Sequence, residues 1–266
     1  MYVTVEGDPV YVYTGTRAFE RARPTILFVH GASNDHSVWA LQARYFAHHG
    51  NNALAVDLPA HGRSGGDARP SIASIADWMS ALLDALGVDR AVVVGHSMGA
   101  LAALDMTARY PARVRAVALL GPAAPMSVSD VLLDAARAGE HLAFELMTAW
   151  TFSAVSHLGG NRQPGFWMTT NALRLMERSR PGVLHADLDA CHRYAGGLTA
   201  AAAVGCPVLL VFGQRDLMVP PKDAGPLLDT LPNKRVVTIP ECGHSMMAEA
   251  PDAVLDALRE FTGSLP

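Results

Sequence analysis

The stretch Ala91-Val-Val-Val-Gly-His-Ser-Met-Gly-Ala100 decides the fold of this chain. Its first four residues are apolar and mostly β-branched, which predicts a buried strand. The pattern Gly-x-Ser-x-Gly, centred on Ser97, follows at once, and the Ala-rich segment 98–110 predicts a helix. A serine placed between a strand and a helix, with small residues on both sides, predicts a sharp turn that presents its hydroxyl as a nucleophile. An ordinary strand-to-helix turn that only uses glycine is the alternative.

Short apolar runs of strand length recur on both sides of this stretch. Both faces of these runs are apolar, which is typical of parallel strands covered by helices on each side. Segments with helical apolar spacing separate them, and the first residues predict an antiparallel hairpin around Gly7-Asp8. The alternation predicts an α/β fold, a doubly wound and mostly parallel sheet of about eight strands. The central runs are 26–29, 53–56, 91–94, 117–120, 208–212 and 236–239.

The alternation of strands and helices breaks between Gly121 and Cys206. This part has no strand pattern and contains four helical stretches separated by Gly and Pro pairs, at 128–138, 141–152, 166–178 and 184–194. We therefore expect a core formed by residues 1–121 and 205–266, and a helical cap, or lid, inserted as residues 122–204.

The strand, the Gly-His-Ser-Met-Gly turn and the helix together resemble the α/β-hydrolase family. The resemblance covers nearly the whole chain except the insertion, and it implies a nucleophile, an acid and a histidine in that order. Asp216 follows the strand 208–212, and His244 follows the strand 236–239. The resemblance thus implies Ser97 as nucleophile, His244 as general base and Asp216 as the acid that orients the histidine. Asp223 and Glu241 are competing acids.

The segment Val29-His30-Gly31-Ala32 resembles the oxyanion loop of the same family. By that resemblance the backbone N–H groups of Ala32 and Met98 form the oxyanion hole, and His30 has a structural role. Ser33 stands where many relatives carry a second glycine, which leaves the shape of this loop open. The segment Asp57 to Ser64 resembles a structural segment of the family, with a catalytic Asp57 as the alternative.

The insertion is rich in large apolar residues, which predicts an apolar pocket over the nucleophile. We expect a serine hydrolase that cleaves a small to medium apolar carboxylic ester through an acyl-enzyme. One alternative is a C–C bond hydrolase of a vinylogous diketone acid, which needs a cationic anchor for the substrate carboxylate. Another is a small-molecule-binding protein with low turnover. The candidate anchors are Arg162, Arg174, Arg178 and Arg193.

Composition excludes several other classes of function. The 266 residues carry a net charge of −4 and no Lys/Arg run, so we expect no nucleic-acid partner. No run approaches about 20 apolar residues and no signal-peptide pattern opens the chain, so we expect no membrane partner and a cytoplasmic location. The three cysteines suit reduced thiols. His48, His49 and His61 lack ligand partners, and no nucleotide-binding pattern follows a strand, so we expect neither metal nor cofactor. Homo-oligomerisation stays open.

Overall fold

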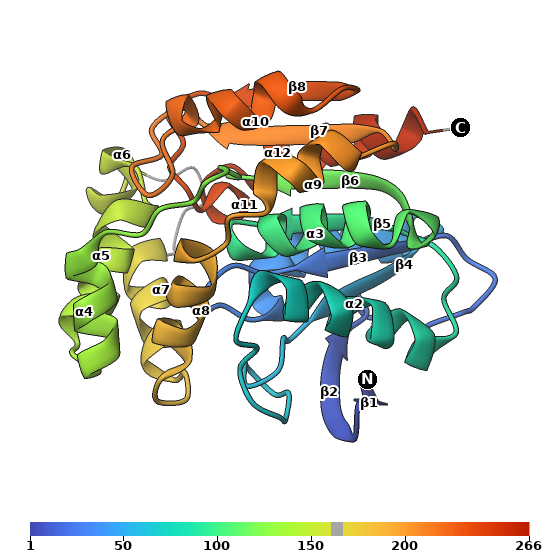
Figure 1. The fold of residues 1–266 in the computed structure, drawn as a ribbon, viewed down its shortest axis with the longest axis horizontal. Helices are drawn as coiled ribbons and strands as arrows, with labels where there is room; N and C mark the ends of the chain where they lie inside the picture. Colours follow the sequence, from blue (N-terminus) through green and yellow to red (C-terminus); the bar gives the residue numbers. More distant parts are fainter. Residues whose placement is uncertain (161–166, 266) are drawn as a thin grey trace.

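The computed structural model describes residues 1–160 and 167–265 around one eight-stranded sheet (Figure 1). The strand order is β1-β2-β4-β3-β5-β6-β7-β8. The first hairpin is antiparallel and β2 joins β4 antiparallel, whereas all pairings from β4 to β8 are parallel. The doubly wound, mostly parallel sheet is therefore confirmed. The strands are β1 Tyr2–Val5, β2 Asp8–Tyr13, β3 Thr25–Val29, β4 Asn52–Val56, β5 Ala91–His96, β6 Val114–Leu120, β7 Val208–Gly213 and β8 Lys234–Ile239.

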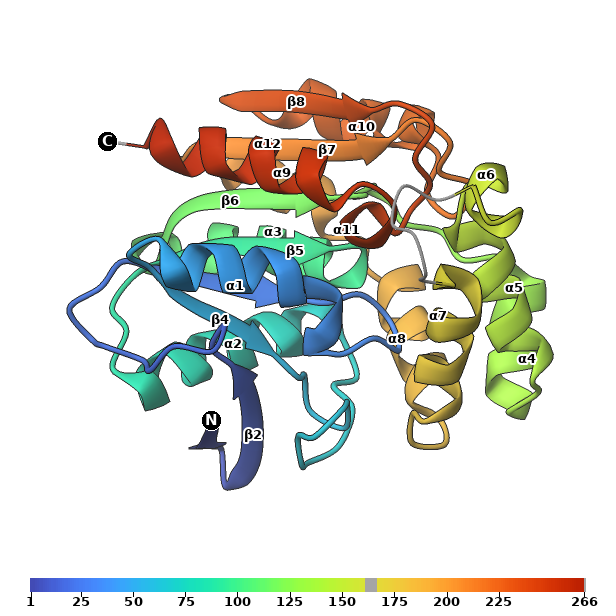
Figure 2. The same cartoon turned by 180° about the vertical axis from the view of Figure 1, so that it is seen from behind.

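Helices cover both faces of the sheet because alternate strand residues point to opposite sides. Along β3, Leu27 and Val29 belong to one apolar cluster, and Ile26 and Phe28 belong to the other. One face packs against α2 Ile72–Leu86, α3 Met98–Arg109, α9 Gly197–Ala203 and α10 Gly225–Thr230 (Figure 1). The other packs against α1 Ala40–His48, α11 Met246–Glu249 and α12 Pro251–Gly263 (Figure 2). The described residues also form three short 3₁₀ helices, η1 His36–Trp39, η2 Pro111–Arg113 and η3 Pro221–Ala224.

Of the six helices that the described residues form between β6 and β7, five gather at one end of the sheet (Figures 1 and 2). Four of the five share a small apolar cluster that includes Leu132, Met147 and Leu188 and reaches Ala32 of the core. Helix α9, which we expected within the cap, packs on α3 instead. Phe166, the first residue of one expected helix, lies outside the described residues. The five helices are α4 Asp130–Ala138, α5 Leu142–Thr151, α6 Ala154–His157, α7 Met168–Glu177 and α8 Val183–His192.

Strand β8 differs from the expectation of burial on both faces. Val236 is 45% exposed, and most of the strand is accessible. The reason is its position, because β8 is the last strand of the sheet and pairs only with β7. Among the described residues, no helix is long and apolar enough to cross a membrane.

Candidate active site

Ser97 occupies a strained turn between β5 and α3. Its φ of 53° and ψ of −117° lie in a region that side-chain-bearing residues rarely adopt. A Cβ on Gly95 would lie 2.1 Å from the carbonyl oxygen of Gly99, and a Cβ on Gly99 would lie 2.5 Å from the carbonyl oxygens of Val29 and His30. The two glycines of the motif therefore allow the strand and the helix to approach closely. Ser97 is partly exposed while its neighbours are buried.

Gly95→Ala should lower the free energy of unfolding by about 3 kcal/mol, because an overpacked Cβ forces backbone to move. Urea unfolding followed by circular dichroism measures the change. Gly205→Ala is the matched control, since a Cβ there meets no atom within 4 Å. Equal effects of the two substitutions would contradict the close approach of strand and helix.

His244 and Asp216 form a buried pair on the loops that follow β8 and β7. The Nδ1 atom of His244 lies 2.6 Å from Oδ2 of Asp216, and only 4% of each residue is exposed. The other carboxylate oxygen, Oδ1, accepts the N–H of Val219 at 2.8 Å. Both carboxylate oxygens are thus held, and one fixes the imidazole ring. The Nε2 atom of His244 is buried and has no hydrogen-bond partner within the described chain.

The two competing acids take other positions. Glu241 is exposed and pairs with Arg215 at 3.1 Å, while Asp223 lies in η3 at the edge of the pocket. The structure places neither of them in a described ion pair with His244. Of the three acids, Asp216 is the one in contact with the imidazole.

The loop that carries His244 is anchored to the base of the cap. The backbone N–H groups of His244 and Ser245 both donate to the carbonyl of Thr151, at 2.7 and 3.3 Å. The buried carboxylate of Glu249 accepts the N–H of Gly243 through Oε1, and the N–H and hydroxyl of Ser153 through Oε2. Our reading of the sequence missed Glu249, because nothing in a short helical segment signals that its carboxylate is buried.

His96, inside the Gly-x-Ser-x-Gly motif, also forms a hydrogen bond to the loop that carries His244. Its Nε2–H donates to the backbone carbonyl of His244 at 2.9 Å, and the two rings lie 4.6 Å apart. Burial, followed by the charge of His244, lowers the pKa of His96 well below its ordinary value. His96 therefore stays neutral and acts as a hydrogen-bond donor.

The two expected oxyanion donors belong to the segments that follow β5 and β3. Met98 is the first residue of α3, so its N–H has no acceptor within the helix. Ala32 follows β3 and lines the same pocket as Ser97. Ser33 has a φ of 53°, in the left-handed region that glycine favours. The residue that replaces a glycine of the family therefore keeps a glycine-like backbone conformation.

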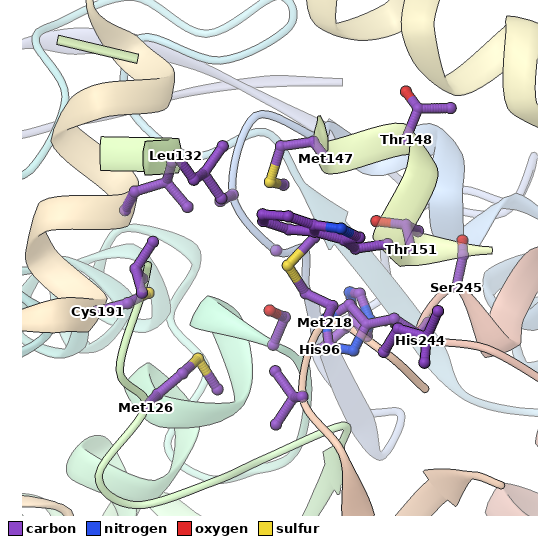
Figure 3. A pocket seen from close by; sticks show the side chains of 18 of the residues that line it. His96, Met126, Leu132, Met147, Thr148, Thr151, Cys191, Met218, His244 and Ser245 are labelled. Carbon is purple, nitrogen blue, oxygen red and sulfur yellow. The ribbon is translucent and has the colours of Figure 1, made fainter. Parts of the chain in front are cut away.

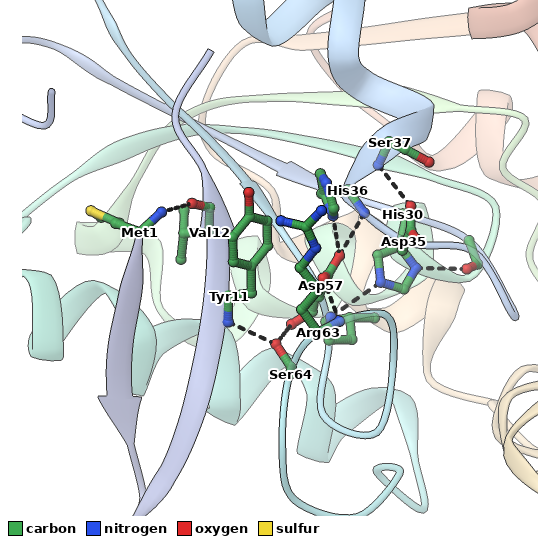
Figure 4. Close-up of polar contacts among 12 residues, drawn as sticks. Met1, Tyr11, Val12, His30, Asp35, His36, Ser37, Asp57, Arg63 and Ser64 are labelled. Atoms are coloured by element: carbon green, nitrogen blue, oxygen red, sulfur yellow. Dashed lines mark hydrogen bonds and ion pairs between the residues drawn. The ribbon is translucent and has the colours of Figure 1, made fainter. Parts of the chain in front are cut away.

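His30 and Asp57 have structural contacts that the sequence only suggested. Nδ1 of His30 donates to the Gly31 carbonyl, and its Nε2 accepts the N–H of Leu58. Asp57 accepts two hydrogen bonds from His36, each at 2.7 Å, and one from the N–H of Arg63 (Figure 4). Burial raises the pKa of Asp57, but these hydrogen bonds outweigh it and the pKa is lowered. Asp57 thus holds the turn that runs from Asp57 to Arg63.

One group of described side chains has donor atoms close enough to share a metal ion. It consists of Asp35, His36 and Asp57, whose atoms lie within 4.8 Å of one another. The ring Nδ1 of His36 is hydrogen-bonded to Asp57, and Asp35 accepts the N–H of Ser37. His36 and Asp57 are thus bonded to each other and Asp35 to Ser37, and we assign no metal to the three.

A cavity of about 390 Å³ opens over Ser97 and His244. Figure 3 shows Met126, Leu132, Met147, Cys191 and Met218 around it. Threonine and serine hydroxyls supply most of its other polar lining, and no Lys or Arg of the described chain lines it. The lining of the cavity is therefore mostly apolar.

A strained serine turn at the carboxyl end of a central strand, lining one cavity with the histidine of a buried His–Asp pair, is typical of a hydrolase of the α/β class. A model of the alpha/beta hydrolase fold matches residues 24–251, and the chain belongs to that family.

Relatives and solved structures agree with an esterase-like hydrolase. The chain is 31% identical over 244 residues to a pimeloyl-[acyl-carrier protein] methyl ester esterase of Aromatoleum aromaticum, covering 86% of this chain and 94% of that protein. It is 25% identical to protein ABHD8 of Bos taurus, of whose length it spans 56%. A solved thermophilic esterase is 26% identical with a TM-score of 0.83, covering 100% of this chain and 97% of that one. The enol-lactonase of Burkholderia xenovorans LB400 shares the fold at 22% identity, with a TM-score of 0.86 over 99% of this chain and 100% of that one.

Proposed function

We propose that this protein is a serine hydrolase that cleaves small to medium apolar carboxylic esters through an acyl-enzyme intermediate. One observation carries the proposal. The buried pair of His244 and Asp216 leaves Nε2 without a partner within the described chain, in the same cavity as Ser97. Substrate-free structures often hold the serine–histidine hydrogen bond long, and it tightens when substrate binds.

The mechanism follows from these contacts. Nε2 of His244 takes the Ser97 proton as the hydroxyl oxygen attacks the ester carbonyl, and Asp216 stabilises the imidazolium that forms. The N–H groups of Ala32 and Met98 bind the developing oxyanion, each contributing about 3–4 kcal/mol. His244 then protonates the leaving alcohol. In the second half of the reaction His244 takes a proton from water as the water attacks the acyl group, and it returns that proton to the Ser97 oxygen as the acid is released.

The charge of the cavity favours esters over carboxylate-bearing C–C substrates. Arg193 pairs with Asp189 on α8, and Arg174 pairs with Glu177 on α7. Arg178 is exposed and lines a separate hollow. Arg162 lies outside the described residues. None of the described candidates thus lines the cavity over Ser97, and a buried carboxylate without a cationic partner costs several kcal/mol.

The proposal predicts turnover of 4-nitrophenyl esters with short acyl chains, and covalent labelling of Ser97 by a fluorophosphonate. Acyl chains from acetate to octanoate, compared by kcat/KM, report how the cavity accepts apolar length. A chain that binds these esters but turns over less than one equivalent per hour would instead be the low-turnover binding protein. A labelled Ser97 without ester turnover would favour another acyl substrate.

A further inference from the structure

A buried ion pair joins the cap to the core beside the oxyanion loop. Nε2 of His61, on the loop after β4, lies 2.8 Å from Oδ2 of Asp187, on the cap helix α8. Their side chains are 3% and 2% exposed. The two residues are 126 positions apart in the chain, so the contact exists only because the cap lies against the core.

The same carboxylate oxygen holds the backbone of the oxyanion loop. The N–H of Ser33 donates to Oδ2 of Asp187 at 2.8 Å. Ser33 directly follows Ala32, and its left-handed φ of 53° is a strained conformation that persists only where neighbouring contacts impose it. Ser33 is also buried, so its N–H would have no access to water without this acceptor.

His61 makes the carboxylate a fixed acceptor. Nδ1 of His61 contacts the Pro59 carbonyl at 2.9 Å, and Nε2 contacts Asp187. Both partners are acceptors, so both ring nitrogens carry protons and His61 is an imidazolium. Burial lowers the pKa of His61, but the charge and hydrogen bond of Asp187 outweigh it and the pKa is raised.

Three other titratable groups lie near the pair: His30, Asp57 and Cys191. His30 lies with its ring 4.8 Å from that of His61, and burial and the His61 charge lower the pKa of His30 to about 4, so it is neutral. Asp57 adds a weaker favourable charge to His61. Burial, then the charge of Asp187, raises the pKa of the Cys191 thiol, which stays protonated.

We propose that Asp187 is a positioning residue of the active site: held by His61, it fixes the Ser33 N–H and thereby aims the Ala32 N–H at the oxyanion. The inference rests on the proposed function. Asp187 belongs to the cap, so a side chain of the cap holds the backbone of the oxyanion loop. The oxyanion hole therefore has its full geometry only when the cap lies against the core.

Asp187→Asn is the sharpest test, because it keeps the size of the side chain and an acceptor oxygen while it removes the charge that holds His61. We expect kcat on a short 4-nitrophenyl ester to fall by about tenfold to hundredfold. This is less than the decrease in kcat of about 10²–10³-fold that follows removal of a whole oxyanion donor, because the Ala32 N–H is displaced and not removed. KM should change less than about threefold, since the ground-state carbonyl uses the hole weakly. Asp187→Ala, which leaves the Ser33 N–H without its acceptor, should lose more.

A transition-state mimic separates positioning from general damage. The Ki of a boronic acid that forms a tetrahedral adduct on Ser97 should rise by the same factor as kcat/KM falls. Asp189→Asn, on the same helix but paired with Arg193, is the control and should stay within twofold of wild type. Thermal melting and the fraction of enzyme labelled by fluorophosphonate confirm that each variant is folded. A folded Asp187→Asn variant with unchanged kcat, or one whose Ki stays fixed while kcat falls, would overturn the proposal.

The pH dependence gives a second measurement. Because the pKa of His61 is raised, its support of the loop is complete below the ordinary histidine pKa of about 6.5 and is lost as the pH rises through the raised value. NMR titration of the histidine Cε1–H signals, with His61→Gln to assign the peak, should show a lower pKa for His61 in Asp187→Asn than in wild type, because the neighbouring negative charge is gone. An unchanged titration would refute the pairing. If wild type neither hydrolyses esters nor accepts the label, the proposed function fails, whereas this titration still tests the pair.

Discussion

Ser97→Ala should lower kcat on ester substrates by about 10⁶-fold, the loss seen when a serine nucleophile acting with its base is removed. Without the hydroxyl, His244 has no proton to take and no acyl-enzyme forms. The fold should survive, because the contacts that hold the turn are made by the backbone: the Ser97 N–H donates to the Leu120 carbonyl, and the Ser97 carbonyl accepts from Ala100. Steady-state assays, normalised by protein folded in circular dichroism, measure the loss.

The control for this variant removes a serine hydroxyl elsewhere. Ser80 lies on α2, outside the cavity over Ser97, and Ser80→Ala should keep kcat within about twofold. Residual turnover of Ser97→Ala within tenfold of wild type would remove the nucleophile assignment and with it the proposed function.

Asp216→Asn should lower kcat by about 10⁴-fold, by analogy with the same change in a serine protease. The amide keeps the size of the carboxylate, but it can present its NH₂ group to Nδ1 of His244. That would place the imidazole proton on Nε2, the atom that must accept the proton of Ser97. The variant also loses the negative charge that stabilises the imidazolium. The pH dependence of kcat/KM in both enzymes shows whether the active base has changed.

Asp223→Asn is the matched variant for this prediction, since Asp223 borders the same cavity and makes no described contact with His244. We expect it to lower kcat less than about tenfold. The reverse ranking of the two variants would assign the orienting role to Asp223.

The sequence predicted the sheet well because its signals are local. The apolar runs that became β3 to β7 are buried on both faces, and the Gly-x-Ser-x-Gly turn stands where strand and helix meet. Strand β8 was misjudged, because its apolar run is the same whether the strand is central or at an edge. Sequence pattern does not report the number of neighbours of a strand.

The supports of the site were beyond prediction for a related reason. Asp187 and Glu249 are isolated acids on helical segments, where a carboxylate ordinarily faces solvent. Each acts through partners far away in the chain, Asp187 through Ser33 and Glu249 through Ser153. Only the docking of the cap brings these groups together. The order nucleophile, acid and histidine came from the family resemblance, and the His244–Asp216 contact is what the structure adds to it.

The hydrogen bonds from His244 and Ser245 to the Thr151 carbonyl have a consequence for how substrate reaches Ser97. They tie the end of α5 to the backbone of the proposed general base. If α5 swung outward as a hinged flap, it would pull the imidazole away from the serine. We therefore expect substrate entry and product release to depend on rearrangement of side chains around the mouth of the cavity. An enzyme whose cap had detached would no longer hold its general base in position.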